Sequence, residues 1–222
     1  MDLTRKTATE ATRAAHSAME AALPADDGSD FVLAKRGFVG SIPDADVPGA
    51  WSQRPFAFLE GERPDTVNPS LWRQARLNAH HGLFEVTPGV YQVRGFDISN
   101  ITFIRGNTGW LVIDPLTTEQ TARDSYDLIT AQLGFLPVVA VIYTHSHTDH
   151  FGGVLGVTSQ EEVDAGRCII IAPEHFMRET VGENVIAGPA MSRRAIYQFG
   201  PLLPAGPTGH VDCGLGNSVP IG

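Results

Sequence analysis

Three histidines and an aspartate follow a strand-like segment within six residues. Residues 138–143 are apolar and mostly β-branched, which is typical of a buried strand. His145, His147, Asp149 and His150 come directly after it. Neutral imidazoles and carboxylates are the usual nitrogen and oxygen ligands of zinc, and a bound cation would relieve the cost of bringing such groups together. The pattern predicts a metal site at a strand end; the alternative is a polar or surface loop rich in histidine.

The spacing of these residues indicates a loop rather than a helix. His145 and His147 are two positions apart, whereas a helical H-E-x-x-H site places its histidines one turn apart. Gly152 and Gly153 follow, and they allow a sharp turn into the next element.

The motif His145-x-His147-x-Asp149-His150 resembles the signature of the metallo-β-lactamase superfamily. Three further blocks are similar to its alkyl sulfatase branch, and the resemblance runs from about residue 31 to the end. The blocks read PDTVNPSLWRQARLN (64–78), GLFEVTPGVYQVRGFDISNITFIRGNTGWLVIDPL (82–116) and GENVIAGPAMSRRAIYQFG (182–200).

The resemblance implies an α/β fold, the metallo-β-lactamase αββα sandwich, of which this chain would hold the first half. Residues 1–82 are then expected to form a helical and extended N-terminal arm. Residues 83–222 would form the N-terminal part of the catalytic domain. In the alkyl sulfatase branch, helical and lipid-carrier-like modules follow, and homodimers are expected by analogy.

The same resemblance implies two Zn²⁺ ions in a complete site. His145 and His147 would hold the first, and Asp149 and His150 the second. Asp149 would thereby take part in catalysis. Asp114 ends the strand expected at 110–113 and resembles the acid that lies behind the metal ligands and orients their imidazoles. A cap or turn role for Asp114 is the alternative.

The function implied is zinc-dependent hydrolysis of alkyl sulfate esters to an alcohol and inorganic sulfate by a metal-activated water. Two alternatives remain open. One is another hydrolase of the same fold: a β-lactamase, a thioesterase or a nuclease. The other is a non-catalytic, incomplete metal-binding fragment, because the branch supplies two carboxylates and a further histidine downstream of the signature.

Other histidines and two arginines are weaker candidates. His80 and His81 end an expected helix, His175 begins another, and His210 lies in a Pro- and Gly-rich stretch; for each, a structural role is the favoured interpretation. The arginines Arg193 and Arg194 could hold a sulfate group through forked hydrogen bonds, but a solvated helix face is favoured.

Composition excludes some partners. The formal net charge of −9 argues against a broad nucleic-acid surface, and no apolar run is long enough to span a membrane. Charged residues interrupt residues 1–22, so no secretion signal is visible. A cytoplasmic location is expected, or a periplasmic or secreted one if a leader is missing from the sequence. The two cysteines, Cys168 and Cys213, do not make a disulfide framework.

Periodicity and turn residues predict the elements that position the metal loop. A helix is expected at 118–133, followed by the strand 138–143, so that 110–143 forms a strand–helix–strand unit. Two hairpins should precede it, at 84–93 and 100–113.

The remaining expectations concern the flanking elements. They are a helix at 2–22, an irregular arm at 31–63 packed through Phe38, Trp51, Phe56 and Phe58, a helix at 71–80 capped by Ser70, helical turns at 153–165, a buried strand at 167–172, a helix opened by Pro173, and a helix at 177–199 interrupted at Gly188-Pro189.

Overall fold

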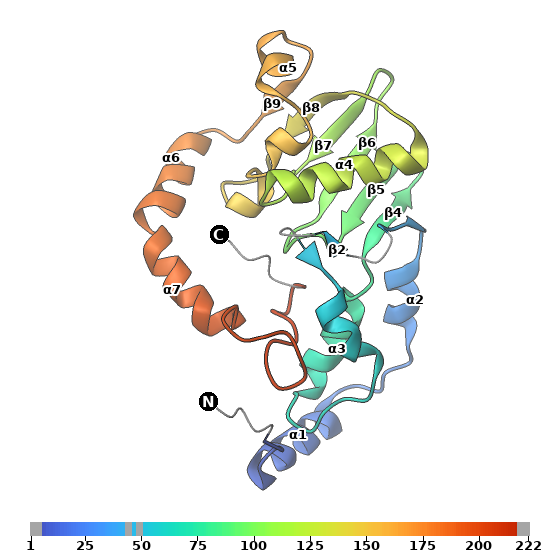
Figure 1. The fold of residues 1–222 in the computed structure, drawn as a ribbon, viewed down its shortest axis with the longest axis vertical. Helices are drawn as coiled ribbons and strands as arrows, with labels where there is room; N and C mark the ends of the chain where they lie inside the picture. Colours follow the sequence, from blue (N-terminus) through green and yellow to red (C-terminus); the bar gives the residue numbers. More distant parts are fainter. Residues whose placement is uncertain (1–5, 43–45, 48–50, 217–222) are drawn as a thin grey trace.

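A computed structural model describes residues 6–42, 46–47 and 51–216. Within them, one mixed sheet has the strand order β1-β4-β5-β6-β7-β8-β9 (Figure 1). Its strands run antiparallel as far as β7, and β7, β8 and β9 are parallel. The bounds are β1 Phe38–Gly40, β4 Gly82–Thr87, β5 Val90–Arg94, β6 Ile101–Arg105, β7 Trp110–Ile113, β8 Val138–Ile142 and β9 Ile169–Ile171.

The other described elements are helices and a small second ladder. The ladder pairs β2 (Asp46–Val47) with β3 (Trp51–Ser52). The helices and helical turns are α1 Glu10–Ala22, α2 Ser29–Lys35, η2 Arg54–Glu60, α3 Pro69–Asn78, α4 Glu119–Leu133, η3 Thr148–His150, η4 Val154–Gly156, α5 Gln160–Asp164, α6 Phe176–Thr180, the π-helical η5 Val181–Ile186 and α7 Gly188–Phe199. No helix in the described ranges has the length and apolar character needed to cross a bilayer.

The core lies between the sheet and α4, which runs across one face of it (Figure 1). Trp110 is completely buried there, with the rings of Tyr91 and Phe103 edge-on at centroid distances of 5.9 and 6.0 Å. Burying such a side chain contributes about 1.5–3 kcal/mol. The strands that precede the histidine loop are therefore held by tight packing.

The predicted strand–helix–strand unit is confirmed. The Thr118 side chain accepts a hydrogen bond from the Thr121 amide and caps α4, and Gly134 ends the helix at a φ of 85°. The connection then returns the chain to pair β8 in parallel with β7. Both predicted hairpins are also present, as β4–β5 and β6–β7.

The expected irregular arm at 31–63 is wrong in part. Residues there form α2, β1, β3 and η2. The Phe38 side chain is 54% exposed, although its ring packs edge-on against buried Phe84 at a centroid distance of 5.4 Å. Trp51 is buried as expected, stacked on Phe96 at a centroid distance of 3.9 Å. Phe56 and Phe58 are partly buried in a second cluster.

Three helix starts differ from the predictions. The first helix begins at Glu10, after a Thr9 cap. Asn68, and not Ser70, caps α3, because its side chain accepts from the Ser70 amide while proline occupies the first helical position. Pro173 opens no helix, since α6 begins only at Phe176.

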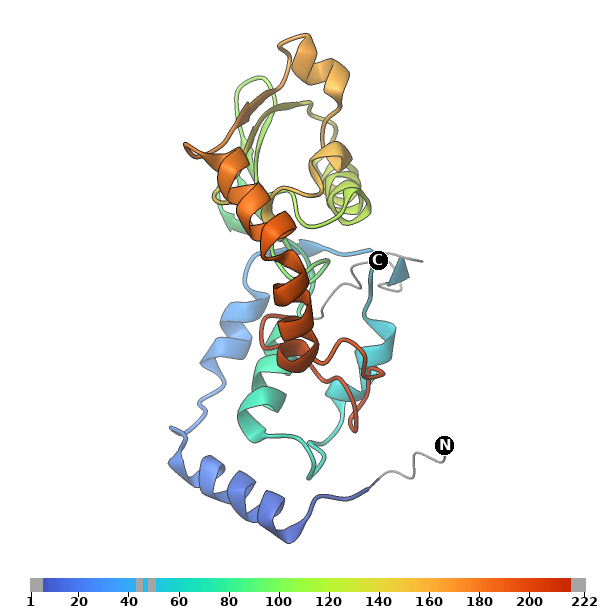
Figure 2. The same cartoon turned by 90° about the vertical axis from the view of Figure 1, so that its left-hand side faces the viewer.

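The expected buried strand at 167–172 is exposed. β9 pairs with β8, yet Ile169, Ile170 and Ile171 are 54, 37 and 45% exposed, and only Cys168 before them is buried. An apolar run marks a strand that can be covered, but whether it is covered depends on other elements. Beyond β9, α6, η5 and α7 curve away from the sheet, and none of their described residues is buried (Figures 1 and 2). The helix does break before Pro189, as expected.

Candidate metal centre

The histidine loop leaves β8 and packs closely on the start of α4. A Cβ atom added to Gly153 would lie 2.1 Å from the Pro115 carbonyl oxygen and 2.5 Å from that of Thr118. The Gly153 amide also donates to the Leu116 carbonyl at 2.9 Å. Glycine is needed here because two backbones approach each other, and not because of an unusual φ. This contact fixes the end of the loop.

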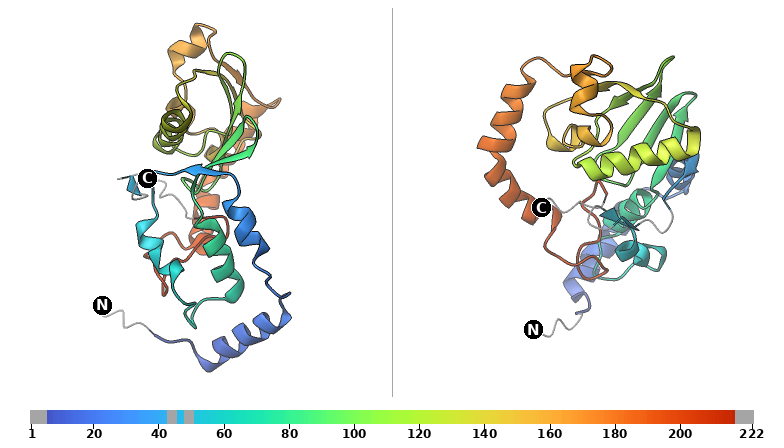
Figure 3. Two further views of the ribbon diagram at one scale, coloured as in Figure 1. Left: turned by 90° about the vertical axis from the view of Figure 1, so that its right-hand side faces the viewer. Right: turned by 45° about the horizontal axis from the view of Figure 1, so that its top comes forward.

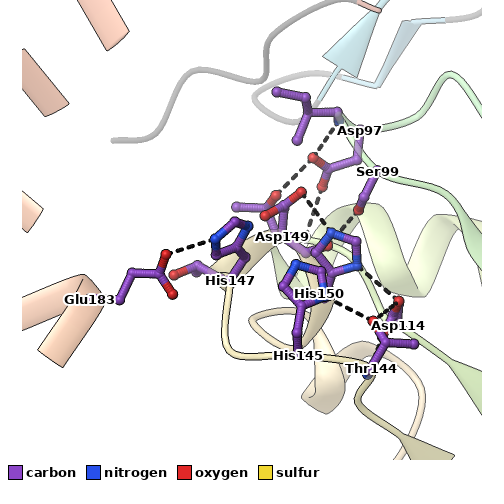
Figure 4. A network of polar contacts seen from close by, with 12 residues as sticks. Asp97, Ser99, Asp114, Thr144, His145, His147, Asp149, His150 and Glu183 are labelled. Atoms are coloured by element: carbon purple, nitrogen blue, oxygen red, sulfur yellow. Dashed lines mark hydrogen bonds and ion pairs between the residues drawn. The ribbon is translucent and has the colours of Figure 1, made fainter. Parts of the chain in front are cut away.

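Asp114 holds the other end of the loop and one of its histidines (Figure 4). Its Oδ1 accepts from the Thr144 amide at 2.8 Å, and its Oδ2 accepts from Thr144 Oγ1 at 2.7 Å and from His150 Nδ1 at 2.8 Å. Asp114 has a φ of 53°, a conformation that costs a non-glycine residue roughly 1 kcal/mol or more. Three hydrogen bonds offset that cost and orient the His150 ring.

His150 lies between two carboxylates. Its Nδ1 faces Asp114, and its Nε2 is 3.2 Å from Asp149 Oδ2. A neutral ring that donates from Nδ1 has only a lone pair on Nε2, and this would face the acceptor oxygen of Asp149. Either an imidazolium or a cation between these two atoms satisfies both groups. The geometry at this pair therefore suits a bound metal ion.

His145 is arranged with its Nε2 atom available as a ligand. The Thr144 hydroxyl donates its proton to Asp114, so it must accept from His145 Nδ1, which is 2.9 Å away. Burial lowers the pKa of His145, and the neighbouring His150 and His147 lower it further. The ring centroid lies 4.0 Å from that of His150 and 4.5 Å from that of His147. A neutral imidazole with a free Nε2 is the form that binds metal.

His147 is held by a residue that sequence reasoning missed. Its Nε2 is 2.7 Å from Oε1 of Glu183 in η5, and Ser146 Oγ donates to Glu183 Oε2 at 3.0 Å (Figure 4). Next to this pair, Asn184 Nδ2 donates to the Ser146 carbonyl at 3.2 Å. The only sequence signal for Glu183 is its place in the 182–200 block, which carries no spacing that points to the histidines.

A second network fixes the loop from the β5–β6 side. Buried Asp97 accepts from the Thr117 amide at 2.9 Å and from Thr121 Oγ1 at 2.9 Å, and the hydroxyl of Ser99 donates to the Asp149 carbonyl. Burial raises the pKa of Asp97. A cavity of 330 Å³ opens beside these residues, and Asp114, Asp149 and His150 are among its lining side chains.

The four predicted ligands thus come together in one loop, and their donor types fit zinc. Their donor atoms are directed at different partners, with His147 turned toward Glu183. Within the described part of the chain, no three His, Cys, Asp or Glu side chains surround one point that could hold a metal ion. The four residues predicted as ligands are present, and the His147 side chain would have to reorient for its Nε2 to join the other three.

The weaker candidates lie elsewhere. His210 is 7% exposed and packs edge-on against Phe56 at a centroid distance of 6.0 Å. His175 is exposed before α6, and Arg193 and Arg194 lie on the exposed surface of α7.

Comparison with known proteins gives the family. Residues 94–218 match the metallo-beta-lactamase superfamily. The chain is 50% identical over 206 residues to alkyl/aryl-sulfatase BDS1 of Saccharomyces cerevisiae, covering 90% of this chain and 32% of that protein. It is 47% identical over 226 residues to a linear primary-alkylsulfatase of Pseudomonas sp., covering 99% of this chain and 34% of that one.

A solved structure shares the fold of nearly the whole chain. The stereoselective inverting sec-alkylsulfatase Pisa1 from Pseudomonas sp. superposes with a TM-score of 0.90 at 43% identity, over 99% of this chain and 35% of that one. The chain therefore spans about a third of the length of the relatives it matches. With more than half of its residues in the superfamily match and an α/β fold shared with Pisa1, this chain belongs to the metallo-beta-lactamase superfamily.

Proposed function

We propose that this chain is the metal-binding portion of a zinc-dependent hydrolase that cleaves alkyl sulfate esters to an alcohol and inorganic sulfate. The observation that carries this is the loop 144–150, in which Asp114 orients His150 and Thr144 fixes the tautomer of His145. Three relatives that match 90, 99 and 96% of this chain are named as alkylsulfatases, which supports the sulfate ester as substrate class.

His145 and His147 would hold one zinc ion, and Asp149 and His150 the second. Bound zinc would supply a Lewis acid and lower the pKa of a water so that hydroxide forms near neutral pH. The hydrogen bond to Asp114 keeps the proton of His150 on Nδ1. The other ring nitrogen, Nε2, lies beside Asp149 and would be the atom that binds the metal. The cavity beside Asp149 and His150 is open to an incoming ester.

A second candidate is a metal-binding segment without catalysis of its own. It is favoured by the observation that no three donors converge in the described residues. Another hydrolase of the same fold is less well supported, because the named relatives that span this chain are alkylsulfatases. A cytoplasmic location and a homodimer stay predictions.

The test is zinc content per chain by elemental analysis, together with sulfate release from dodecyl sulfate. The proposal expects zinc and sulfate release, both lost in His145→Ala and both kept in His175→Ala, which removes an exposed histidine outside the loop. Zinc without sulfate release would support the non-catalytic candidate. Cleavage of a β-lactam, thioester or phosphodiester in preference to the sulfate would replace the substrate class.

A further inference from the structure

A second cavity, of 380 Å³, lies between α2, η2 and the end of α3. α2 and α3 lie side by side in this part of the molecule (Figures 2 and 3). The described lining residues are Phe31, Lys35, Gln53, Arg54, Phe56, Ala57, Leu59, Glu60, Arg76, Ala79, His80 and His81. None of them lines the cavity beside Asp149 and His150. Its volume is within the usual range for small-molecule sites.

Basic side chains from several elements meet at this cavity. Lys35 comes from α2, Arg76 from α3, and His80 follows α3. Among the described lining residues, Glu60 is the one carboxylate. No ion pair between described residues joins Lys35, Arg76 or His80 to an acid. Nearby acids are already used, since Arg73 holds Asp26 and Asp30 with N–O distances of 2.8 Å.

The charges are close enough to affect one another. Burial lowers the pKa of His80, and the charges of Lys35, His81 and Arg76 lower it further. Positive charges this close repel one another. A bound anion would be attracted to each of them and would offset the repulsion.

The other walls of the cavity are apolar. Phe31, Phe56 and Leu59 line it, and the Arg76 guanidinium lies over the Phe31 ring at 5.4 Å from its centroid. Apolar walls with a few convergent charges are typical of a site that orients a ligand by its polar end. Lys35 and His80 could also stabilise the C-terminal ends of α2 and α3 through the helix dipoles. That role does not require a cavity with apolar walls.

We propose that this cavity binds a small organic anion, with its carboxylate or sulfonate-like head held by Lys35, Arg76 and His80 and a short alkyl tail against Phe31, Phe56 and Leu59. The proposal does not depend on the proposed hydrolase function, because the two cavities share no described lining residue.

Titration calorimetry on the full chain in EDTA tests it without any contribution from bound metal. The probes are hexanoate and hexanesulfonate, which has no cleavable ester, with acetate for the head alone and hexanol for the tail alone. Both hexyl anions are expected to bind at least about tenfold more tightly than acetate or hexanol, because head and tail both contribute. Binding of only one hexyl anion would identify the head group and still support the site.

Lys35→Met and Arg76→Met should each weaken hexanoate binding about tenfold, because a hydrogen bond to a charged group is lost. Arg36→Met is the matched control: Arg36 follows Lys35, is exposed and does not line the cavity, so its affinity should stay unchanged. Circular dichroism would confirm that the variants fold, and hexanoate should move the His80 ring resonances in the wild-type chain.

Three results would overturn the proposal. One is no binding of either hexyl anion. Another is equal loss of affinity in the Arg36 control, which would indicate only long-range charge. The last is a lower melting temperature in the Lys35 and Arg76 variants with an unchanged response to hexanoate, which would leave the cations as helix-end stabilisers.

Discussion

The sheet with its histidine loop is packed much more tightly than residues 173–199, which are here called the arm and are distinct from the N-terminal arm. Five residues of α4 are buried against the sheet, whereas none of the described residues of α6, η5 and α7 is. Figure 3 shows α6 and α7 forming a curved arm beside the sheet region. Yet both regions contribute to the site: His150 is fixed from the core by Asp114, and His147 is fixed from the arm by Glu183.

This contrast suggests that the two histidines differ in mobility. His150 has a side chain that is 21% exposed and has a partner on a packed strand end, whereas His147 is 56% exposed and relies on an exposed helix. A site made this way can keep one half of its ligands in place while the other half adjusts. The predictions below test whether the difference between core and arm is energetic as well as geometric.

The largest expected difference is between two glycines. Gly153→Ala should lower the free energy of unfolding by about 3 kcal/mol, because its Cβ would overlap backbone oxygens that cannot move freely. Gly182→Ala, in η5, meets nothing within 4 Å and should leave stability within about 1 kcal/mol of the wild type. Urea unfolding measures both. Equal destabilisation would show that the arm is packed as tightly as the loop.

Two neighbouring strand residues give the next contrast. Val141 and Ile170 are partners across β8 and β9, but Val141 is completely buried and Ile170 is partly exposed. Val141→Ala should cost about 2 kcal/mol, and Ile170→Ala about 1 kcal/mol although it removes more atoms. Thermal unfolding would check this. A larger loss for Ile170 would mean that β9 is covered in solution.

Asp114→Asn tests whether the carboxylate orients the ligands. The change weakens the contacts to Thr144 and His150, and zinc affinity should fall about 10–100-fold. The exposed Asp127→Asn, on α4, is the control and should bind zinc as the wild type does. An unchanged affinity in Asp114→Asn would support the turn role instead.

Glu183→Ala should have the smallest effect on stability, less than about 1 kcal/mol, because the pair with His147 is largely exposed. Zinc affinity should not fall. Glu183 Oε1 contacts His147 Nε2, the nitrogen that would bind the metal, so removing the carboxylate frees a ligand atom. A competition assay with a zinc-sensitive dye measures it. A tenfold loss of affinity would show that Glu183 is itself a ligand and that the arm completes the site.

Much of the core and its loop could be predicted from local signals. The Thr118 cap and Gly134 end define α4, and alternating apolar residues with Pro88-Gly89 define the β4–β5 hairpin. The histidine loop is predictable because its four candidate ligands lie within six consecutive residues. Asp114 is predicted only to end a strand, and the resemblance alone implies its role behind the ligands; the parallel pairing of β7 with β8 brings it beside the end of β8.

The sequence could not predict contacts between distant segments. Glu183 reaches Ser146 across 37 positions, and no periodicity links the two. The exposure of β9 depends on what lies over it, and three isoleucines in a row look the same in a covered and an uncovered strand. His210 is buried and packs against Phe56, a residue in η2 that spacing alone could not place beside it.

The strand order of the main sheet rises with the sequence from β1 to β9. Because a ribosome releases the N-terminal end of a chain first, each strand after β4 emerges when its partner is already present. The sheet can therefore grow at one edge during synthesis. The longest connection between consecutive strands from β4 to β8 contains α4, a helix that can form from local contacts alone. The histidine loop emerges directly after β8, onto a platform that is already assembled.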